Sequence, residues 1–309
     1  MQRIPTITAG LLLGVSFATT AHSDLLDDIR TDATFTVGTE ARFAPFEYIE
    51  DGEIVGYSAD IMEHIMSELE GVELIRMDLP WQGILPGLER ERFDYVITSV
   101  TATPERMERY HLSAPIADAT MAMLKRAGED DISSPEDIAG KVAAAQAGSA
   151  QLEALEALAA ELEETGTPVA DIRTYTGVDE AYAELGTGRV DVVINSLPNL
   201  LEAERTRPDV FEVVGTFGDP VYFSWAGRDD EESASINAFM DEQIQRLNED
   251  GTLNELQEKW FGGPMDLPLE LPAAESNNDH ALPPKSSCSG SRHQSSASPR
   301  LRTSGRCPP

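Results

Sequence analysis

Short runs of β-branched and aromatic residues alternate with segments of helical hydrophobic spacing along most of the chain. The run SADIMEHIMSEL, for example, places Ile61, Ile65 and Leu69 four residues apart, which is the spacing of one buried helix face. Such alternation is typical of α/β proteins. In the first part of the chain it predicts strands at 34–39, 72–78 and 95–98, and helices at 58–69, 82–90 and after Pro104.

A second α/β unit is expected to begin near residue 119. Its predicted strands lie at 141–146, 172–175 and 190–194, and its predicted helices at 150–164, 178–185 and 197–205, with a further helix start at Ser134-Pro135. A strand at 220–226 and helices at 231–249 and 253–260 then complete the periodic part of the sequence.

The two ends of the chain have different compositions. Arg3 precedes the apolar core AGLLLGVSFA, and small residues end at Ser23, just before Asp24. This pattern is typical of a cleaved signal peptide at residues 1–23, which would direct the protein to the periplasm; a buried N-terminal helix is the alternative. Residues 264–309 are rich in Pro, Ser and Arg without apolar periodicity, and a disordered tail is expected there.

Composition excludes several classes of function. The 309 residues carry a formal net charge of −32, so phosphate backbones would be repelled and no nucleic-acid partner is expected. Both cysteines, Cys288 and Cys307, lie in the predicted tail, and the five histidines are scattered. Neither a disulfide framework, nor a metal site, nor a bound cofactor is therefore predicted.

Hydroxyl-bearing residues gather in the run TSVTATPER, where a predicted strand passes into a helix. A helix start offers free N–H groups, and Arg106 just inside it can hold a carboxylate through two parallel hydrogen bonds. Alternatively, Thr103 only caps the helix and Arg106 pairs with a surface acid. The segment VGTEARFAPF adds an acid, Glu40, and aromatic rings. Together the two segments predict a pocket for a small molecule that bears a carboxylate.

Six motifs follow one another in order: GTEARFAPF, GEIVGYSADI, WQGILPGLERERFDYVITSVTATPER, the turn Gln146-Ala147-Gly148-Ser149, GTGRVDVVI and LNEDGTLNELQEKWFG. With this combination, from about Phe35 to Phe261, the chain resembles the bacterial extracellular solute-binding proteins of family 3, the periplasmic components of polar amino-acid ABC importers. The resemblance implies an α/β, two-lobe periplasmic binding protein fold of type II, with two crossover hinge strands and the ligand in the interlobe cleft. Lobe 1 would comprise residues 24–118 and 215–263, and lobe 2 residues 119–214.

The resemblance also implies how the ligand's carboxylate is held. Arg106 should clamp it, and Ser99 and Thr101 should add hydroxyl or backbone N–H hydrogen bonds. Ser149 should reach it from a helix start in lobe 2. Hinge closure then needs only contacts that differ between the open and closed forms.

Two rings and one acid complete the implied pocket. Phe43 stands where the family has a stacking aromatic residue, and Trp81 where an apolar wall residue is usual; packing in the core is the alternative for both rings. Glu40 stands where relatives that bind basic or polar amino acids often have aspartate. A carboxylate there would suit a ligand with a positive group, and a solvated acid at the strand end is the alternative.

One position departs from the family pattern. The segment VDVVINSLPNL places Ser196 where amino-acid binders usually carry the aspartate that holds the α-ammonium. A hydroxyl stabilises an ammonium less than a charged acceptor does. The ligand is therefore expected to be an amino acid or, alternatively, a derivative without a free α-amino group, such as ectoine or an opine. Neighbouring Asn195 could supply an amide contact.

The resemblance implies a periplasmic receptor, not an enzyme, that passes its ligand to an ABC importer permease in the inner membrane. Some proteins of this fold are cyclohexadienyl dehydratases, which use a glutamate just after the strand at 190–194. Here that loop reads Ser196-Leu197-Pro198-Asn199, and Glu202 comes only later, so proton transfer lacks its agent. A sensor input domain, which would normally continue into a membrane span, is a further alternative.

Overall fold

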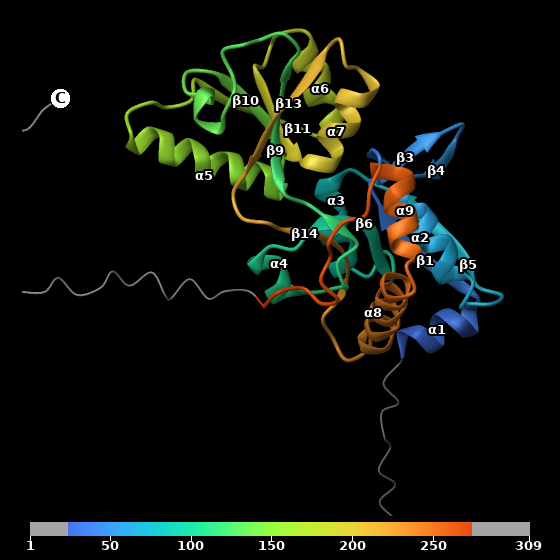
Figure 1. Ribbon diagram of the computed structural model, residues 1–309. Coiled ribbons are helices and arrows are strands. Elements are labelled where there is room, and N and C mark those ends of the chain that lie inside the picture. The colour runs from blue at the N-terminus through green and yellow to red at the C-terminus, as the bar shows by residue number, and fades with distance from the viewer. Residues whose placement is uncertain (1–23, 274–309) are drawn as a thin grey trace, which may run out of the picture. The chain divides into compact units, whose positions relative to one another are not determined.

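The computed structural model describes residues 24–273 (Figure 1). The predicted signal peptide at 1–23 and the part of the predicted tail from residue 274 onward lie outside these residues. The described residues build two α/β lobes, each around its own sheet, and a small three-stranded sheet. The predicted α/β class is therefore confirmed.

The sheet of lobe 1 brings three pocket-forming segments to one edge. In sheet order its strands are β5 (Glu73–Asp78), β1 (Thr34–Thr39), β6 (Tyr95–Thr101), β14 (Tyr222–Arg228) and β7 (Tyr110–Leu112), with β8 (Ala117–Asp118) also paired to β14. β1 is parallel to both β5 and β6, whereas β14 runs antiparallel to β6. Because the carboxyl ends of parallel strands meet at the same edge, the residues that follow β1, β5 and β6 are close together.

Helices and a small sheet surround this sheet. They are α1 (Leu25–Asp32), α2 (Tyr57–Met66), α3 (Trp81–Glu89), α4 (Pro104–Arg109), α8 (Ala234–Glu249), α9 (Thr252–Phe261), β2 (Arg42–Phe43), β3 (Glu47–Glu50) and β4 (Glu53–Val55). The core of lobe 1 is aromatic, with Trp225, Tyr57 and Phe46 fully buried. The Phe46 ring centroid lies 5.0 Å from that of Phe223, which ties the β2–β3 region to β14.

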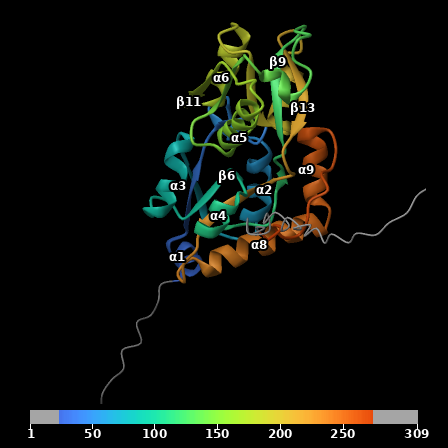
Figure 2. The same cartoon turned by 90° about the vertical axis from the view of Figure 1, so that its left-hand side faces the viewer.

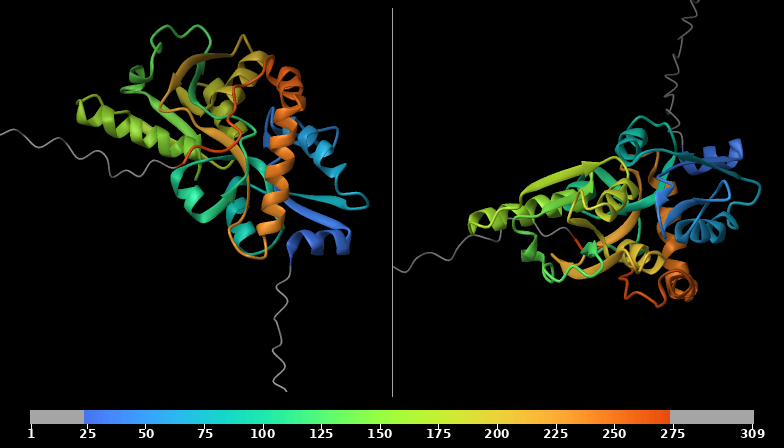
Figure 3. Two further views of the ribbon diagram at one scale, coloured as in Figure 1. Left: turned by 60° about the horizontal axis from the view of Figure 1, so that its bottom comes forward. Right: turned by 90° about the horizontal axis from the view of Figure 1, so that it is seen from above.

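Lobe 2 repeats the arrangement with a five-stranded sheet. Its strands, in sheet order, are β11 (Asp171–Tyr175), β10 (Val142–Gln146), β12 (Val192–Ser196), β9 (Met121–Arg126) and β13 (Phe211–Phe217), and its helices are η1 (Pro135–Ile138), α5 (Ala150–Glu164), α6 (Val178–Gly186) and α7 (Leu197–Thr206). The helix start predicted at Ser134-Pro135 is a single 3₁₀ turn, η1. α5, drawn yellow-green in Figure 3, packs against β10 and β12 through Leu155 and Leu162, and only its first residues reach the pocket.

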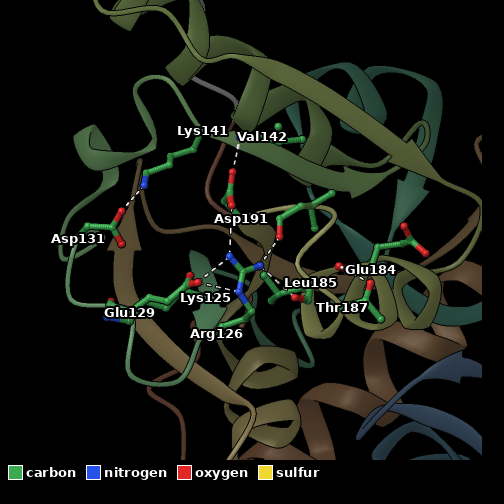
Figure 4. Close-up of polar contacts among 11 residues, drawn as sticks. Lys125, Arg126, Glu129, Asp131, Lys141, Val142, Glu184, Leu185, Thr187 and Asp191 are labelled. Carbon is green, nitrogen blue, oxygen red and sulfur yellow. Dashed lines mark hydrogen bonds and ion pairs between the residues drawn. The ribbon is translucent and has the colours of Figure 1, made fainter.

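Arg126, at the end of β9, joins the strands of lobe 2 to its helices (Figure 4). Its Nη1 donates to the carbonyl oxygens of Leu185 (3.1 Å) and Val190 (2.5 Å), and its Nη2 lies 3.2 Å from Oδ1 of Asp191. The other carboxylate oxygen of Asp191 accepts from the Val142 N–H at 2.9 Å. These bonds join the end of β9 to the starts of β12 and β10, at the edge of the sheet opposite Gln146, which ends β10.

The chain crosses between the lobes twice, after β8 and after β13. The first predicted lobe boundary, at 118/119, lies in the crossover between β8 and β9. The second, at 214/215, falls inside β13, because pairing with β9 continues beyond a register shift at Gly215 as far as Phe217.

Residues 264–273, which composition predicted to be disordered, pack on lobe 1. The Met265 N–H donates to Oε1 of Gln257 at 2.7 Å, and Leu267 and Leu271 contact the hydrophobic clusters. Met265, Leu267 and Leu271 hold this segment on lobe 1. Together with Leu269 they stand at every second position, an alternation that the prediction from composition overlooked.

Candidate functional site

A narrow pocket lies between the two lobes, at the carboxyl ends of their parallel strands. In Figure 2, α5 of lobe 2 stands over β6 and α4 of lobe 1. The lining residues are Glu40, Phe43, Trp81, Thr98, Ser99, Thr101, Arg106, Gln146, Ser149 and Gln151. All of the residues predicted to bind the ligand are among them except Asn195 and Ser196. The cavity volume is about 10 Å³, room for about one water molecule, so a larger ligand requires the lobes to move apart.

Arg106 is the buried cation of this pocket, with 8% of its surface exposed. Its Nη1 donates to the carbonyl oxygen of Thr101 at 3.1 Å, and its guanidinium carbon lies 4.9 Å from the centre of the Trp81 ring. Thr103 does cap α4, since its hydroxyl accepts from the Arg106 N–H at 3.3 Å. The surface ion pair considered as an alternative is not found within residues 24–273. Burial lowers the pKa of Arg106, yet a guanidinium stays charged in proteins.

Glu40 is a buried acid rather than a solvated one, with 3% of its surface exposed. Its Oε1 accepts from Nε2 of Gln146 in lobe 2 at 2.6 Å. Burial, together with the charge of Glu47, raises the pKa of Glu40 to about 7, although the Gln146 hydrogen bond acts in the opposite direction. One acid of lobe 1 is thus bonded directly to an amide of lobe 2.

Glu47 lies behind the pocket wall and was missed by the sequence predictions. Its carboxylate accepts from the hydroxyl and N–H of pocket residues, Thr98 and Ser99, and from the hydroxyl of Ser58. Burial raises the pKa of Glu47 to about 7, while these hydrogen bonds lower it. An acid directly after the apolar pair Pro45-Phe46 was the available signal, but its partners lie about fifty residues away in β6.

The lobe 2 wall is formed where β10 passes into α5. The Ser149 hydroxyl accepts from the Leu152 N–H at 3.1 Å and donates to the Gln146 carbonyl oxygen at 2.8 Å, so it caps the helix. Ser149 and Gln151 both line the pocket, which therefore faces the positive end of a 15-residue helix. Gln146 and Gln151 were not predicted as site residues.

The two predicted rings each take part in both the pocket and the packing around it. The Phe43 ring centroid lies 5.9 Å from that of Phe223 and 6.1 Å from that of Phe46, so one side of the ring belongs to the core. Nε1 of Trp81 donates to the Gly148 carbonyl oxygen of lobe 2 at 2.8 Å. Trp81 and Arg106 also line a second cavity of about 340 Å³ on the outer side of this pocket wall.

Asn195 and Ser196 end β12 but do not line the pocket. Nδ2 of Asn195 donates to the Tyr182 hydroxyl at 2.9 Å, and the Ser196 hydroxyl donates to Oδ1 of Asn199 at 2.8 Å. Nδ2 of Asn199 in turn donates to the Ala44 carbonyl oxygen of lobe 1 at 2.8 Å. A neutral, internally bonded network therefore occupies the position at which the family pattern suggested an aspartate.

The chain matches the bacterial extracellular solute-binding proteins, family 3, over residues 35–263. It belongs to this family. Among its relatives is the L-cystine-binding protein TcyJ of Escherichia coli, 28% identical over 258 residues that cover 83% of this chain and 93% of the relative.

Solved structures of similar proteins agree with the two-lobe fold of this solute-binding protein. A mutant of ArgBP from T. maritima is 26% identical with a TM-score of 0.68, covering 77% of this chain and 99% of its own. The ancestral amino acid-binding protein AncCDT-1, a precursor of cyclohexadienyl dehydratase, is 29% identical with a TM-score of 0.68, covering 76% and 99%. The predicted periplasmic binding protein fold is therefore confirmed.

Other features bear on the alternatives to binding. Glu202 of this solute-binding protein lies on α7, pairs with Arg205 at 2.7 Å and lines a different cavity, of about 690 Å³. Residues 24–273 contain no group of three or more His, Cys, Asp or Glu residues suited to a metal ion. No helix in the same range is long and apolar enough to cross a membrane.

Proposed function

We propose that this solute-binding protein captures an amino acid in the periplasm and delivers it to the permease of an ABC importer in the inner membrane. The observation that carries the proposal is Arg106, a buried guanidinium that lines the interlobe pocket and forms no ion pair within the described residues. Glu153 and Glu105 attract this guanidinium from beyond ion-pair distance, so it lacks a close counter-ion among residues 24–273. A buried charge in that state is costly, and a ligand carboxylate can supply the missing partner. The start of α5 adds partial positive charge to the same pocket.

The other end of the ligand is proposed to carry a positive or N–H-rich group. Glu40 lines the pocket with a buried carboxylate, and Thr98, Ser99 and Thr101 add oxygen atoms nearby. The names of relatives support this class of ligand, since they include a probable amino-acid ABC transporter-binding protein of Haemophilus influenzae and a lysine/arginine/ornithine-binding periplasmic protein of Escherichia coli.

The neutral network at Ser196 favours a second candidate within the same function. Ser196 and Asn199 bond to each other rather than presenting a charge, so nothing there replaces an aspartate for an α-ammonium. A ligand without a free α-amino group, such as ectoine or an opine, would not need that charge.

A thermal-shift screen with amino acids, ectoines, opines and betaines tests the proposal. A ligand at 100 times its dissociation constant adds about 2.7 kcal/mol to stability, which raises the melting temperature measurably. A hit among α-amino acids supports the first candidate, and a hit only among ectoines or opines supports the second. Failure of every compound would contradict both.

Replacing Arg106 should weaken whichever ligand the screen finds. Loss of one partner of a desolvated charge pair costs about 2–5 kcal/mol, so Arg106→Ala should reduce affinity by ~30- to 5,000-fold in calorimetry. Arg109→Ala is the matched control, because Arg109 lies one turn further along α4 and pairs with Glu89. Equal affinities of the two variants would contradict the assigned role of Arg106.

Two further parts of the proposal have separate tests. We infer binding without turnover, because Glu202 does not line the pocket; conversion of prephenate or arogenate by the purified protein would contradict this. Export to the periplasm rests on the leader pattern of residues 1–23. Recovery of the mature protein in an osmotic-shock fraction, beginning near Asp24 by mass spectrometry, is the expected result.

A further inference from the structure

Glu47 is a fully enclosed acid whose partners form the pocket wall. It begins β3, and 1% of its surface is exposed. Its Oε1 accepts from the Thr98 hydroxyl and, at 2.6 Å, from the Ser99 N–H. Its Oε2 accepts from the Ser58 hydroxyl at 2.9 Å and from the Ser99 hydroxyl at 3.4 Å. Thr98 and Ser99 line the pocket, whereas Glu47 and Ser58 do not.

An ionised carboxylate can only accept, so it decides where its neighbours' hydrogens point. The single hydrogen of the Thr98 hydroxyl is used by Glu47, and only lone pairs of this oxygen remain for other partners. One of them accepts from the Glu40 N–H at 3.4 Å. The Ser99 N–H is likewise used by Glu47, so it is not free to donate to a ligand.

We propose that Glu47 is a positioning residue that fixes the hydrogen-bonding polarity of this wall, so that Thr98 and Ser99 offer acceptors beside the carboxyl of Glu40 and select a ligand group rich in N–H donors, such as a guanidinium. The inference rests on the proposed function and deepens it. Arg106 and the start of α5 offer donors in the same pocket. A ligand with a carboxylate at one end and a guanidinium at the other can satisfy both walls in one orientation only.

Protonation of Glu47 would reverse part of this polarity. The groups bonded to it from α2 and β6 are neutral, and Glu40 is the charged group with which it interacts. A protonated Glu47 becomes a donor, and a wall hydroxyl that accepts from it can turn its own hydrogen toward the pocket. Burial raises the pKa of Glu47 to about 7, so this change falls near neutral pH.

Glu47→Gln tests the proposal with L-arginine and L-citrulline as probes, by calorimetry at pH 8. The two probes have the same length, but citrulline carries a ureido oxygen, an acceptor, where arginine has another N–H group. The wild type should prefer arginine, and the variant should lose about tenfold of that preference. The amide oxygen must stay at the position of Oε1, which accepts from the Ser99 N–H, so the amide nitrogen takes the place of Oε2 and donates to the Ser99 hydroxyl, whose hydrogen then turns toward the pocket. A preference that is unchanged in a folded variant overturns the proposal, as does an equal loss of affinity for both probes.

A double-mutant cycle separates positioning from a purely structural role. Ser99→Ala removes the wall hydroxyl and keeps the backbone N–H, so if Glu47 acts through the Ser99 hydroxyl the two changes should affect the arginine preference less than additively. Ser58→Ala is the control: it removes a partner of Glu47 that does not line the pocket, and the preference should stay unchanged. Full additivity in the cycle, or an altered preference in Ser58→Ala, overturns the proposal.

Failure of this inference differs from failure of the proposed function. Binding of neither probe to the wild type overturns selection for a guanidinium, even if the thermal-shift screen finds another amino acid. Failure of the whole screen would instead contradict the proposed function.

Discussion

Burial acts in opposite ways on the charged residues around the pocket. A guanidinium keeps its charge when it is buried, so Arg106 remains a cation. The carboxyls of Glu40 and Glu47 have their pKa values raised to about 7, because burial penalises the ionised form. The pocket therefore has a permanent charge on Arg106 and a pH-dependent one on Glu40, and a second pH-dependent acid, Glu47, lies behind its wall.

The raised pKa of Glu47 predicts how stability depends on pH. A glutamate titrates near 4.5 when solvated and near 7 here, so the folded protein binds more protons than the unfolded chain between these values. This contribution to stability is greatest below pH 4.5 and is lost as pH rises to about 7. One pKa unit corresponds to about 1.4 kcal/mol. Between pH 4.5 and 7 the free energy of unfolding of Glu47→Gln should therefore fall by about 3 kcal/mol less than that of the wild type.

Urea unfolding at pH 5 and pH 8 measures this difference. Glu50→Gln is the control, because Glu50 is exposed at the other end of β3 and should leave the pH dependence as in the wild type. If Glu47→Gln and the wild type lost the same free energy of unfolding between the two pH values, Glu47 would not titrate in this range.

At the scale of elements, the helix start that faces the pocket depends on one hydroxyl. The Ser149 hydroxyl bonds to the Leu152 N–H and to the Gln146 carbonyl oxygen, which joins α5 to β10. Ser149→Ala should cost about 1 kcal/mol of unfolding free energy in urea titrations, a typical loss for a helix cap. Ser149→Thr keeps the hydroxyl and should recover most of this loss; equal loss in both variants would show that the cap is not the cause.

Elements with a local signal were predictable from the sequence. α5 has the predicted bounds because its Ala, Leu and Glu residues favour a helix and Ser149 caps it. Glu40, Ser99 and Arg106 line one pocket, as the parallel strands and the family resemblance predicted. The short strands β2, β3 and β4 were missed, because runs of two to four residues carry little periodicity.

Features that depend on long-range contacts were not predictable. Glu47 gains Thr98 and Ser99 as partners from β6, about fifty residues away, and nothing near Glu47 in the sequence indicates this pairing. The bond between Gln146 and Glu40 joins residues 106 positions apart. The predicted roles of Asn195 and Ser196 in binding stay predictions, since β12 places them beside the pocket wall within a network of their own.

At the scale of the whole two-lobe unit, side chains of each lobe bond directly to the other. Trp81 and Gln82, at the start of α3, donate to the carbonyl oxygens of Gly148 (2.8 Å) and Ala147 (2.9 Å). The bonds from Gln146 to Glu40 and from Asn199 to Ala44 also cross between the lobes. Closure therefore draws on contacts that need no ligand, and these contacts should slow the opening that release requires.

Gln82→Ala tests this contribution to closure, because Gln82 bonds across the lobes without lining the narrow pocket that contains Glu40 and Ser149. A neutral hydrogen bond contributes about 0.5–1.5 kcal/mol, so ligand release in stopped-flow experiments should be roughly 2- to 10-fold faster. The association rate of Gln82→Ala should not be lower than that of the wild type. The closed pocket has no room for the ligand, so closure of the empty protein competes with binding, and weaker closure cannot slow association. Gln245→Ala removes a similar bond, to the Leu269 carbonyl oxygen within lobe 1, and should leave release unchanged. Equal release rates for Gln82→Ala and the wild type would mean that ligand contacts alone hold the lobes together.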